Sequence, residues 1–220
     1  MGAARTWVAA RRVTLGVAAL AIALALPGLL AGGGSPVVAA LELRDALATD
    51  SEPWRLLTGH LVHLNGRQLS MNLIAVVWLG CLCEPAMPRR YVTLLVASAL
   101  TVSAGVLHAH PDLASYRGLS GIASAQFAAL VGLRVREGLR SGRKALAFPP
   151  LVASLLFLGK AAFEVGTGRV LFAGGLVLAG AGPSPAAHLY GAIAGLAVAL
   201  LPASRPRSAA ATHGSAARLG

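Results

Sequence analysis

Charged residues and cysteines are both scarce in this sequence. Only 12% of its 220 residues are charged, about half of the roughly 25% found in soluble domains, so little polar surface is available to cover a globule in water. Two cysteines are too few for an extracellular disulfide scaffold. The apolar content of 56% excludes intrinsic disorder, which requires low hydrophobicity. A polytopic membrane protein remains, in agreement with a mean hydropathy of +0.70.

Six apolar runs have the length expected of membrane-spanning helices, for which about 20 residues suffice. The expected spans are residues 13–31, 69–87, 91–108, 118–135, 146–165 and 185–203. The Gly-rich segment 170–182 is too short to cross and is interpreted as a loop or an interfacial segment. A cleaved signal peptide is the competing interpretation of the first run, but its length favours a retained span.

The basic residues gather on alternate sides of these spans. Most of the 19 lie near the N-terminus, at residues 89–90, over residues 134–144 and in the C-terminal tail, whereas most acids, including Glu164 at the end of the fifth span, fall on the opposite side. Because cytoplasmic loops carry an excess of Lys and Arg, this pattern predicts that both ends of the chain are cytoplasmic. The net charge of +11 is then explained by loops that face anionic lipid headgroups, and no nucleic-acid partner is expected.

The expected domain organisation follows from these spans and their orientation. Residues 1–12 form a cytoplasmic N-terminal segment, and residues 13–203 form an all-α membrane domain of six spans. The Ala-, Ser- and Arg-rich residues 204–220 are expected to form a disordered cytoplasmic tail.

Polar residues open the second, fourth and sixth spans. Asn72 follows Gln68 in the second span, Ser120 begins the fourth, and His188 begins the sixth. The three spans run in one direction, so these side chains are expected at a similar depth near the outer surface. Polar residues inside spans are costly and are therefore functional candidates. A Ser and a His on neighbouring helices can act as nucleophile and general base, while an Asn amide and a helix N-terminal N–H can stabilise an oxyanion.

Glycines accompany these polar residues. Gly191 and Gly195 form a G-x-x-x-G face on the sixth span, and Gly118 and Gly121 flank Ser120. Small residues let helix backbones approach closely. The glycines therefore predict the close contact between the fourth and sixth spans that a Ser–His pair requires.

This ordered set of motifs resembles the rhomboid family of intramembrane serine proteases. Gly118-Leu119-Ser120-Gly121 resembles the G-x-S-G motif of that family, and His188 with Gly191 and Gly195 resembles its H-x-x-G-x-x-x-G motif. Asn72, followed by Trp78-Leu79-Gly80 and Glu84, is similar to its second helix. The runs at residues 54–63 and 187–191 look most like the rhombosortase subfamily, which is associated with bacterial exported proteins that carry a C-terminal Gly-rich sorting tail.

The resemblance implies a role for each site residue and no cofactor or metal. Ser120 would be the nucleophile and His188 the general base, while Asn72 and the backbone N–H of Ser120 would form the oxyanion hole. Gln68 stands where rhomboids usually have a His, and its amide is either an oxyanion donor or a loop anchor. Ser124 stands where many rhomboids place an aromatic residue against the imidazole. These two departures favour the alternative of a catalytically impaired, rhomboid-like pseudoprotease that binds membrane helices.

The resemblance also implies a location and a partner. The protein would be a multi-pass protein of the bacterial inner membrane, with its active site on the periplasmic side of the lipid bilayer. Its partner would be a membrane-anchored protein substrate with a Gly-rich C-terminal sorting tail, cleaved near the outer membrane–water interface.

Two further histidines and a cysteine pair are given structural roles. His60 and His63 lack the Glu of an H-E-x-x-H zinc motif and are expected to hold the outer loop by hydrogen bonds. Cys81 and Cys83 are expected to be small apolar side chains rather than a disulfide.

The sequence also predicts the surroundings of two charged residues near or within the spans. Glu84 is expected to cap a helix or to pair near Arg89 or Arg90. Lys160 is the sole candidate for a charge near the midplane of an expected span, and it can snorkel outward. A small transporter or channel subunit is a third functional hypothesis. It would need charges near the membrane midplane and is therefore the least favoured of the three.

Overall fold

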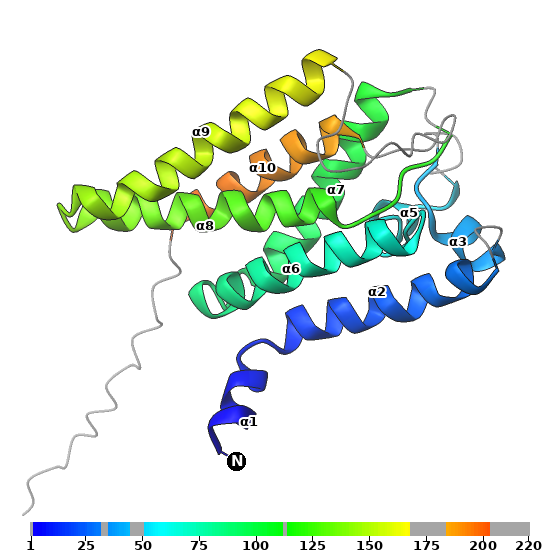
Figure 1. Ribbon diagram of the computed structural model, residues 1–220, viewed down its shortest axis with the longest axis horizontal. Helices are drawn as coiled ribbons and strands as arrows, with labels where there is room; N and C mark the ends of the chain where they lie inside the picture. Colours follow the sequence, from blue (N-terminus) through cyan, green and yellow to red (C-terminus); the bar gives the residue numbers. More distant parts are fainter. Residues whose placement is uncertain (1, 32–34, 45–50, 112–113, 168–183, 203–220) are drawn as a thin grey trace, which may run out of the picture.

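The computed structural model describes residues 2–31, 35–44, 51–111, 114–167 and 184–202 (Figure 1). Six long helices dominate the described residues: α2 (Arg12–Leu30), α6 (Gly66–Ala86), α7 (Tyr91–Ala109), α8 (Ser120–Arg140), α9 (Lys144–Thr167) and α10 (Pro185–Leu200). Three shorter ones are α1 (Gly2–Ala9), α3 (Pro36–Leu41) and α5 (Arg55–Thr58). Each expected span coincides with one long helix, and the all-helical fold is confirmed for the described residues.

Three of these helices are long and apolar enough to cross a membrane. They are α2, α6 and α7, with hydropathies of 2.3, 1.5 and 1.8, and α10 is a shorter apolar helix of 16 residues. The count of six spans and the cytoplasmic placement of both ends stay predictions. The expected loop at 170–182 and the expected tail at 204–220 lie outside the described residues.

Helix α8 occupies the centre of the bundle (Figure 1). It packs against α10, α9, α6 and α7, and its contact with α10 is the most extensive between any two described elements. Its N-terminal half is buried almost all round, over residues 121–126 and at Ala128 and Ala129. Most of these side chains are small, which allows neighbouring helices to approach from several directions.

Helix α2 lies at one edge of the bundle and packs against α6 (Figure 1). The buried carboxylate of Glu84 on α6 accepts hydrogen bonds from the backbone N–H groups of Val13 (3.0 Å) and Thr14 (2.9 Å) at the start of α2. A negative charge at a helix N-terminus is stabilising. Of the two predicted places for Glu84, the structure therefore has the helix cap, and no salt bridge between described residues joins it to Arg89 or Arg90.

The three helices that carry the candidate residues begin at the same end of the bundle. In Figure 1, α6, α8 and α10 all start on the side where α3 and α5 lie. Their first turns are therefore at a similar level, as the alternation of spans predicted.

Candidate active site

A glycine elbow precedes Ser120. Gly118 has φ +118°, a conformation that only glycine adopts without strain, and its N–H donates to the Gly59 carbonyl at 3.2 Å. Two further contacts hold the elbow. The Tyr116 hydroxyl donates to the Gly118 carbonyl at 3.2 Å, and the Tyr116 backbone pairs with Leu43 through N–H···O bonds of 2.8 and 3.2 Å. The chain therefore enters α8 in a defined direction, with Ser120 at its first position.

Two amide side chains of α6 lie directly beside this elbow. A Cβ built on Gly118 would be 2.9 Å from both Asn72 Nδ2 and Gln68 Nε2. Asn72 Nδ2 is buried and has no hydrogen-bond partner among the described residues. An unpaired buried donor costs about 1–3 kcal/mol. Such a donor suits a site that must bind an anion during a reaction.

Gln68 has a different arrangement. Its Nε2 donates to the Arg117 carbonyl at 3.0 Å, and its Oε1 accepts from the Leu64 N–H at 2.8 Å. The side chain thus bridges the segment before α6 to the segment before α8. Of the two predicted roles, these bonds correspond to the loop anchor, although the amide nitrogen also borders Gly118.

Helices α8 and α10 touch backbone to backbone next to Ser120 and His188. A Cβ built on Gly191 would overlap the carbonyl oxygen of Gly121, and one built on Gly195 would overlap that of Ala125. From the other side, a Cβ on Gly121 would be 3.1 Å from the Ala187 carbonyl oxygen. The contact therefore joins the residue after Ser120 to the residue before His188.

Ser120 and His188 themselves are not joined by a hydrogen bond among the described contacts. His188 is buried, with 7% of its surface exposed, and Ser120 is half-buried. Ser120 instead interacts with the phenol of Tyr116. Burial raises the pKa of Tyr116, and its side-chain hydrogen bond with Ser120 opposes that rise. Catalytic hydrogen bonds are often long without substrate and tighten in the complex.

His188 has an acidic partner that sequence reasoning missed. Its Nδ1 lies 2.9 Å from Glu164 Oε2, and Glu164 Oε1 forms a 2.7 Å ion pair with Lys160 Nζ. Lys160 Nζ is also 3.2 Å from His188 Nδ1. Glu164 is completely buried.

The sequence did not predict the contacts of these two charged residues. Helix α9 continues to Thr167, so Glu164 lies within the helix and its side chain faces α10. Lys160 pairs with Glu164 one turn along α9. Opposite charges four residues apart inside an apolar helix were the available signal. The placement of Glu164 on the outer side stays a prediction.

Ser124 stands where many rhomboids have an aromatic residue, and it has no ring to pack on the imidazole. Its hydroxyl donates back along α8 to the Ser120 carbonyl at 3.0 Å. In place of the usual aromatic residue, α8 therefore has a small side chain that is hydrogen-bonded to its own helix.

The two histidines of the outer loop differ from each other. His60 Nε2 lies 3.0 Å from both the Ala99 carbonyl oxygen and Ser103 Oγ, as predicted for a residue that holds the loop. Neither ring nitrogen of His63 has a partner among the described residues, so its predicted hydrogen bonds are wrong. Burial lowers the pKa of each histidine to about 4. Within the described residues, no three His, Cys, Asp or Glu side chains are grouped to hold a metal.

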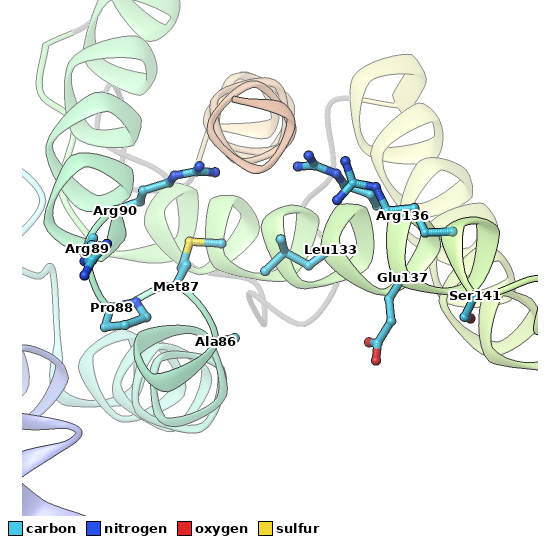
Figure 2. A pocket seen from close by; sticks show the side chains of 10 residues that line it. Ala86, Met87, Pro88, Arg89, Arg90, Leu133, Arg136, Glu137 and Ser141 are labelled. Carbon is cyan, nitrogen blue, oxygen red and sulfur yellow. The ribbon is translucent and has the colours of Figure 1, made fainter. Parts of the chain in front are cut away.

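A cavity of about 800 Å³ lies at the opposite end of α8, beside the turn between α6 and α7 (Figure 2). Figure 2 shows Arg90 and Arg136 reaching toward α10 from either side. Arg90 donates to the carbonyls of Leu201 (2.9 Å) and Pro202, and Arg136 donates to that of Ala199 (3.4 Å). These cations bind carbonyls at and just after the C-terminal end of α10 and complement its dipole, which is a structural role.

The comparison with known families gives one match. The family model described as the Rhomboid domain matches residues 50–205, which is 156 of the 220 residues. The matched range contains α5 to α10 and every candidate site residue. No curated protein matches the chain.

Proposed function

Because the chain belongs to the rhomboid family, whose members are intramembrane serine proteases, we propose that it is a serine endopeptidase of the rhombosortase type. It is a multi-pass membrane protein. The proposed substrate is an exported, membrane-anchored protein with a Gly-rich C-terminal sorting tail. The proposed location is the bacterial inner membrane, with the active site on the periplasmic side.

The observation that carries the proposal is the backbone contact of Gly121 with Gly191. It supports a reacting pair in which Ser120 supplies the nucleophile and His188 the base, since each lies within three residues of the contact. The buried, unpartnered Nδ2 of Asn72 beside Gly118 supports an oxyanion hole at the same place. Preorganised donors of this kind are worth several kcal/mol to a tetrahedral intermediate.

The reaction would proceed through an acyl-enzyme. Ser120 Oγ attacks the scissile carbonyl carbon while its proton passes to His188 Nε2. The oxyanion is then stabilised by Asn72 Nδ2–H and by the Ser120 backbone N–H at the start of α8. Collapse breaks the C–N bond, and His188 gives its proton to the leaving amine. A water molecule, deprotonated by the same imidazole, releases the acyl group and regenerates Ser120.

The position of the pair suits a substrate with a poorly helical segment. Ser120 is the first residue of α8 and His188 lies in the first turn of α10, so both are close to one end of the bundle, from which water would reach the acyl-enzyme. A peptide bond inside a regular helix is shielded by its hydrogen bonds. Glycine disfavours the helix by about 1 kcal/mol per residue, so a Gly-rich segment exposes its carbonyls more readily.

Labelling by a fluorophosphonate probe tests the proposal. The purified, detergent-solubilised wild type is compared with Ser120→Ala and His188→Ala, and loss of labelling is expected in both. Ser70→Ala is the matched control, because Ser70 is an exposed serine of α6 whose hydroxyl bonds to the Gly66 carbonyl at 2.8 Å. Labelling that persists in Ser120→Ala would contradict the assignment of the nucleophile.

A pseudoprotease that binds membrane helices is the second candidate. It is favoured by the missing hydrogen bond between Ser120 and His188 and by the small side chain of Ser124. A folded wild type that does not label, beside an active rhomboid that does, would support it. Gln68→His would then test whether the usual histidine restores labelling.

A further inference from the structure

We propose that Glu164 is a positioning residue for His188, so that Ser120, His188 and Glu164 work as a triad instead of a pair. The inference rests on the proposed function, because it takes His188 as the general base. It goes beyond the Ser–His dyad that the motifs imply, and it assigns a task to an acid on α9.

The geometry at Nδ1 is the first argument. Glu164 Oε2 is 2.9 Å from His188 Nδ1, a hydrogen-bonding distance, and the carboxylate is completely buried. A carboxylate can only accept a hydrogen bond, so it requires a proton on Nδ1. That proton leaves the lone pair on Nε2, which is the tautomer that a base facing Ser120 needs.

Lys160 makes the His188 tautomer depend on Glu164. Its Nζ lies 3.2 Å from the same Nδ1, and an ammonium group can only donate. Without the carboxylate, Lys160 would donate to a bare Nδ1 and favour the tautomer with its proton on Nε2. That tautomer cannot accept a proton from Ser120. Glu164 therefore decides between a productive and an unproductive imidazole.

Lys160 also keeps Glu164 in its charged form. The 2.7 Å contact between Lys160 Nζ and Glu164 Oε1 places a positive charge beside the buried carboxylate and compensates part of the cost of its burial. The pair is neutral as a whole. When His188 gains a proton in the transition state, the carboxylate at its Nδ1 is already in place to stabilise the imidazolium.

A purely structural ion pair is the competing explanation. Lys160 and Glu164 are four residues apart on α9, a spacing that by itself favours pairing. A double variant separates the two explanations. Lys160→Met with Glu164→Leu removes both charges together, which buried ion pairs often tolerate without loss of stability.

The experiment measures the rate of fluorophosphonate labelling and the thermal midpoint for the full chain in detergent. We expect Glu164→Gln to lower the maximal labelling rate by roughly 10²- to 10⁴-fold, as expected when the wrong tautomer is populated. The probe concentration that gives half-maximal rate should change little. Glu164→Asp should recover part of the rate. The folded double variant should be slower than the wild type but faster than Glu164→Gln, because it lacks both the carboxylate and the Lys160 donor at Nδ1.

A spectroscopic measurement reports the tautomer directly. In ¹⁵N spectra of the imidazoles, the His188 signals, assigned by their loss in His188→Ala, should change from the Nδ1–H to the Nε2–H pattern in Glu164→Gln. Lys160→Arg is the matched control, because it keeps the positive charge beside Glu164, and it should keep the Nδ1–H pattern.

Each outcome bears on the inference in a different way. If the folded double variant or Glu164→Gln labels at the wild-type rate, Glu164 does not position His188, and the proposed function stands. If the wild type does not label at all, the proposed function and this inference fail together. An unchanged tautomer in Glu164→Gln would overturn the inference even if labelling were slow.

Discussion

Replacing Gly191 by alanine tests the contact between α8 and α10 directly. The new Cβ would overlap the Gly121 carbonyl oxygen and lie 2.9 Å from its carbonyl carbon. The carbonyl oxygen is the nearest atom, and a Cβ must lie at least about 3 Å from it, so the two backbones must separate by roughly 1 Å or more. The obstacle is backbone on both sides, and no flexible side chain can turn away.

The expected effect on stability is the difference between two terms. Overpacking of this kind costs about 1–3 kcal/mol, and alanine recovers about 1 kcal/mol through its higher helix propensity. We therefore expect a net loss of up to about 2 kcal/mol and a lower thermal midpoint. The effect on chemistry should be larger, because a displacement of about 1 Å at a reacting pair can cost about 10²-fold in rate.

The assay combines thermal unfolding with the rate of fluorophosphonate labelling. Gly16→Ala in α2 and Gly159→Ala in α9 are matched controls, because a Cβ at either position meets no atom within 4 Å. Both should keep wild-type labelling and gain up to about 1 kcal/mol of stability. A Gly191→Ala protein that is as stable and as quickly labelled as these controls would refute the close approach of α8 and α10.

Three further predictions concern the elbow, the outer loop and the far end of the bundle. Gly118→Ala should lower both the thermal midpoint and the labelling rate, because φ +118° strains any other residue by about 1–3 kcal/mol; Gly142→Ala, at φ +66° with no atom within 4 Å, should leave labelling unchanged. Burial lowers the pKa of His60 from 6.5 to about 4, so stability present above pH 6.5 should be lost as the pH falls toward 4. At 1.36 kcal/mol per pKa unit, the loss of stability approaches about 3 kcal/mol. The measurement is the thermal midpoint of the wild type and of His60→Asn between pH 4 and 7. An equal fall of the midpoint in both proteins would contradict the prediction. Arg90→Ala should cost about 1 kcal/mol by removing a cation from the C-terminal end of α10, and labelling should not slow. Arg89 is exposed, and Arg89→Ala should change neither stability nor labelling.

The long helices and the shared level of the candidate residues were predictable from the sequence. Apolar runs of about 20 residues specify helices by local physics alone, because each backbone group must be hydrogen-bonded within its own segment in a membrane. The order of the spans then places Ser120 and His188 in the first turns of α8 and α10, and Asn72 in the second turn of α6, in helices that begin at one end. The G-x-x-x-G face likewise identifies where α10 can approach a neighbour.

The partners of the charged and amide side chains were decided only by the tertiary structure. Glu84 caps α2, Gln68 ties two loops together, and Glu164 meets His188 on another helix. Each of these contacts depends on how far a helix extends, how it is rotated about its axis and how it is shifted against its neighbour. Hydropathy is an average over about 20 residues and is nearly unchanged by a rotation, whereas a hydrogen bond is lost when its atoms move by 1 Å. The sequence therefore determines which helices form and which end carries the polar residues, and packing determines which acid reaches the imidazole.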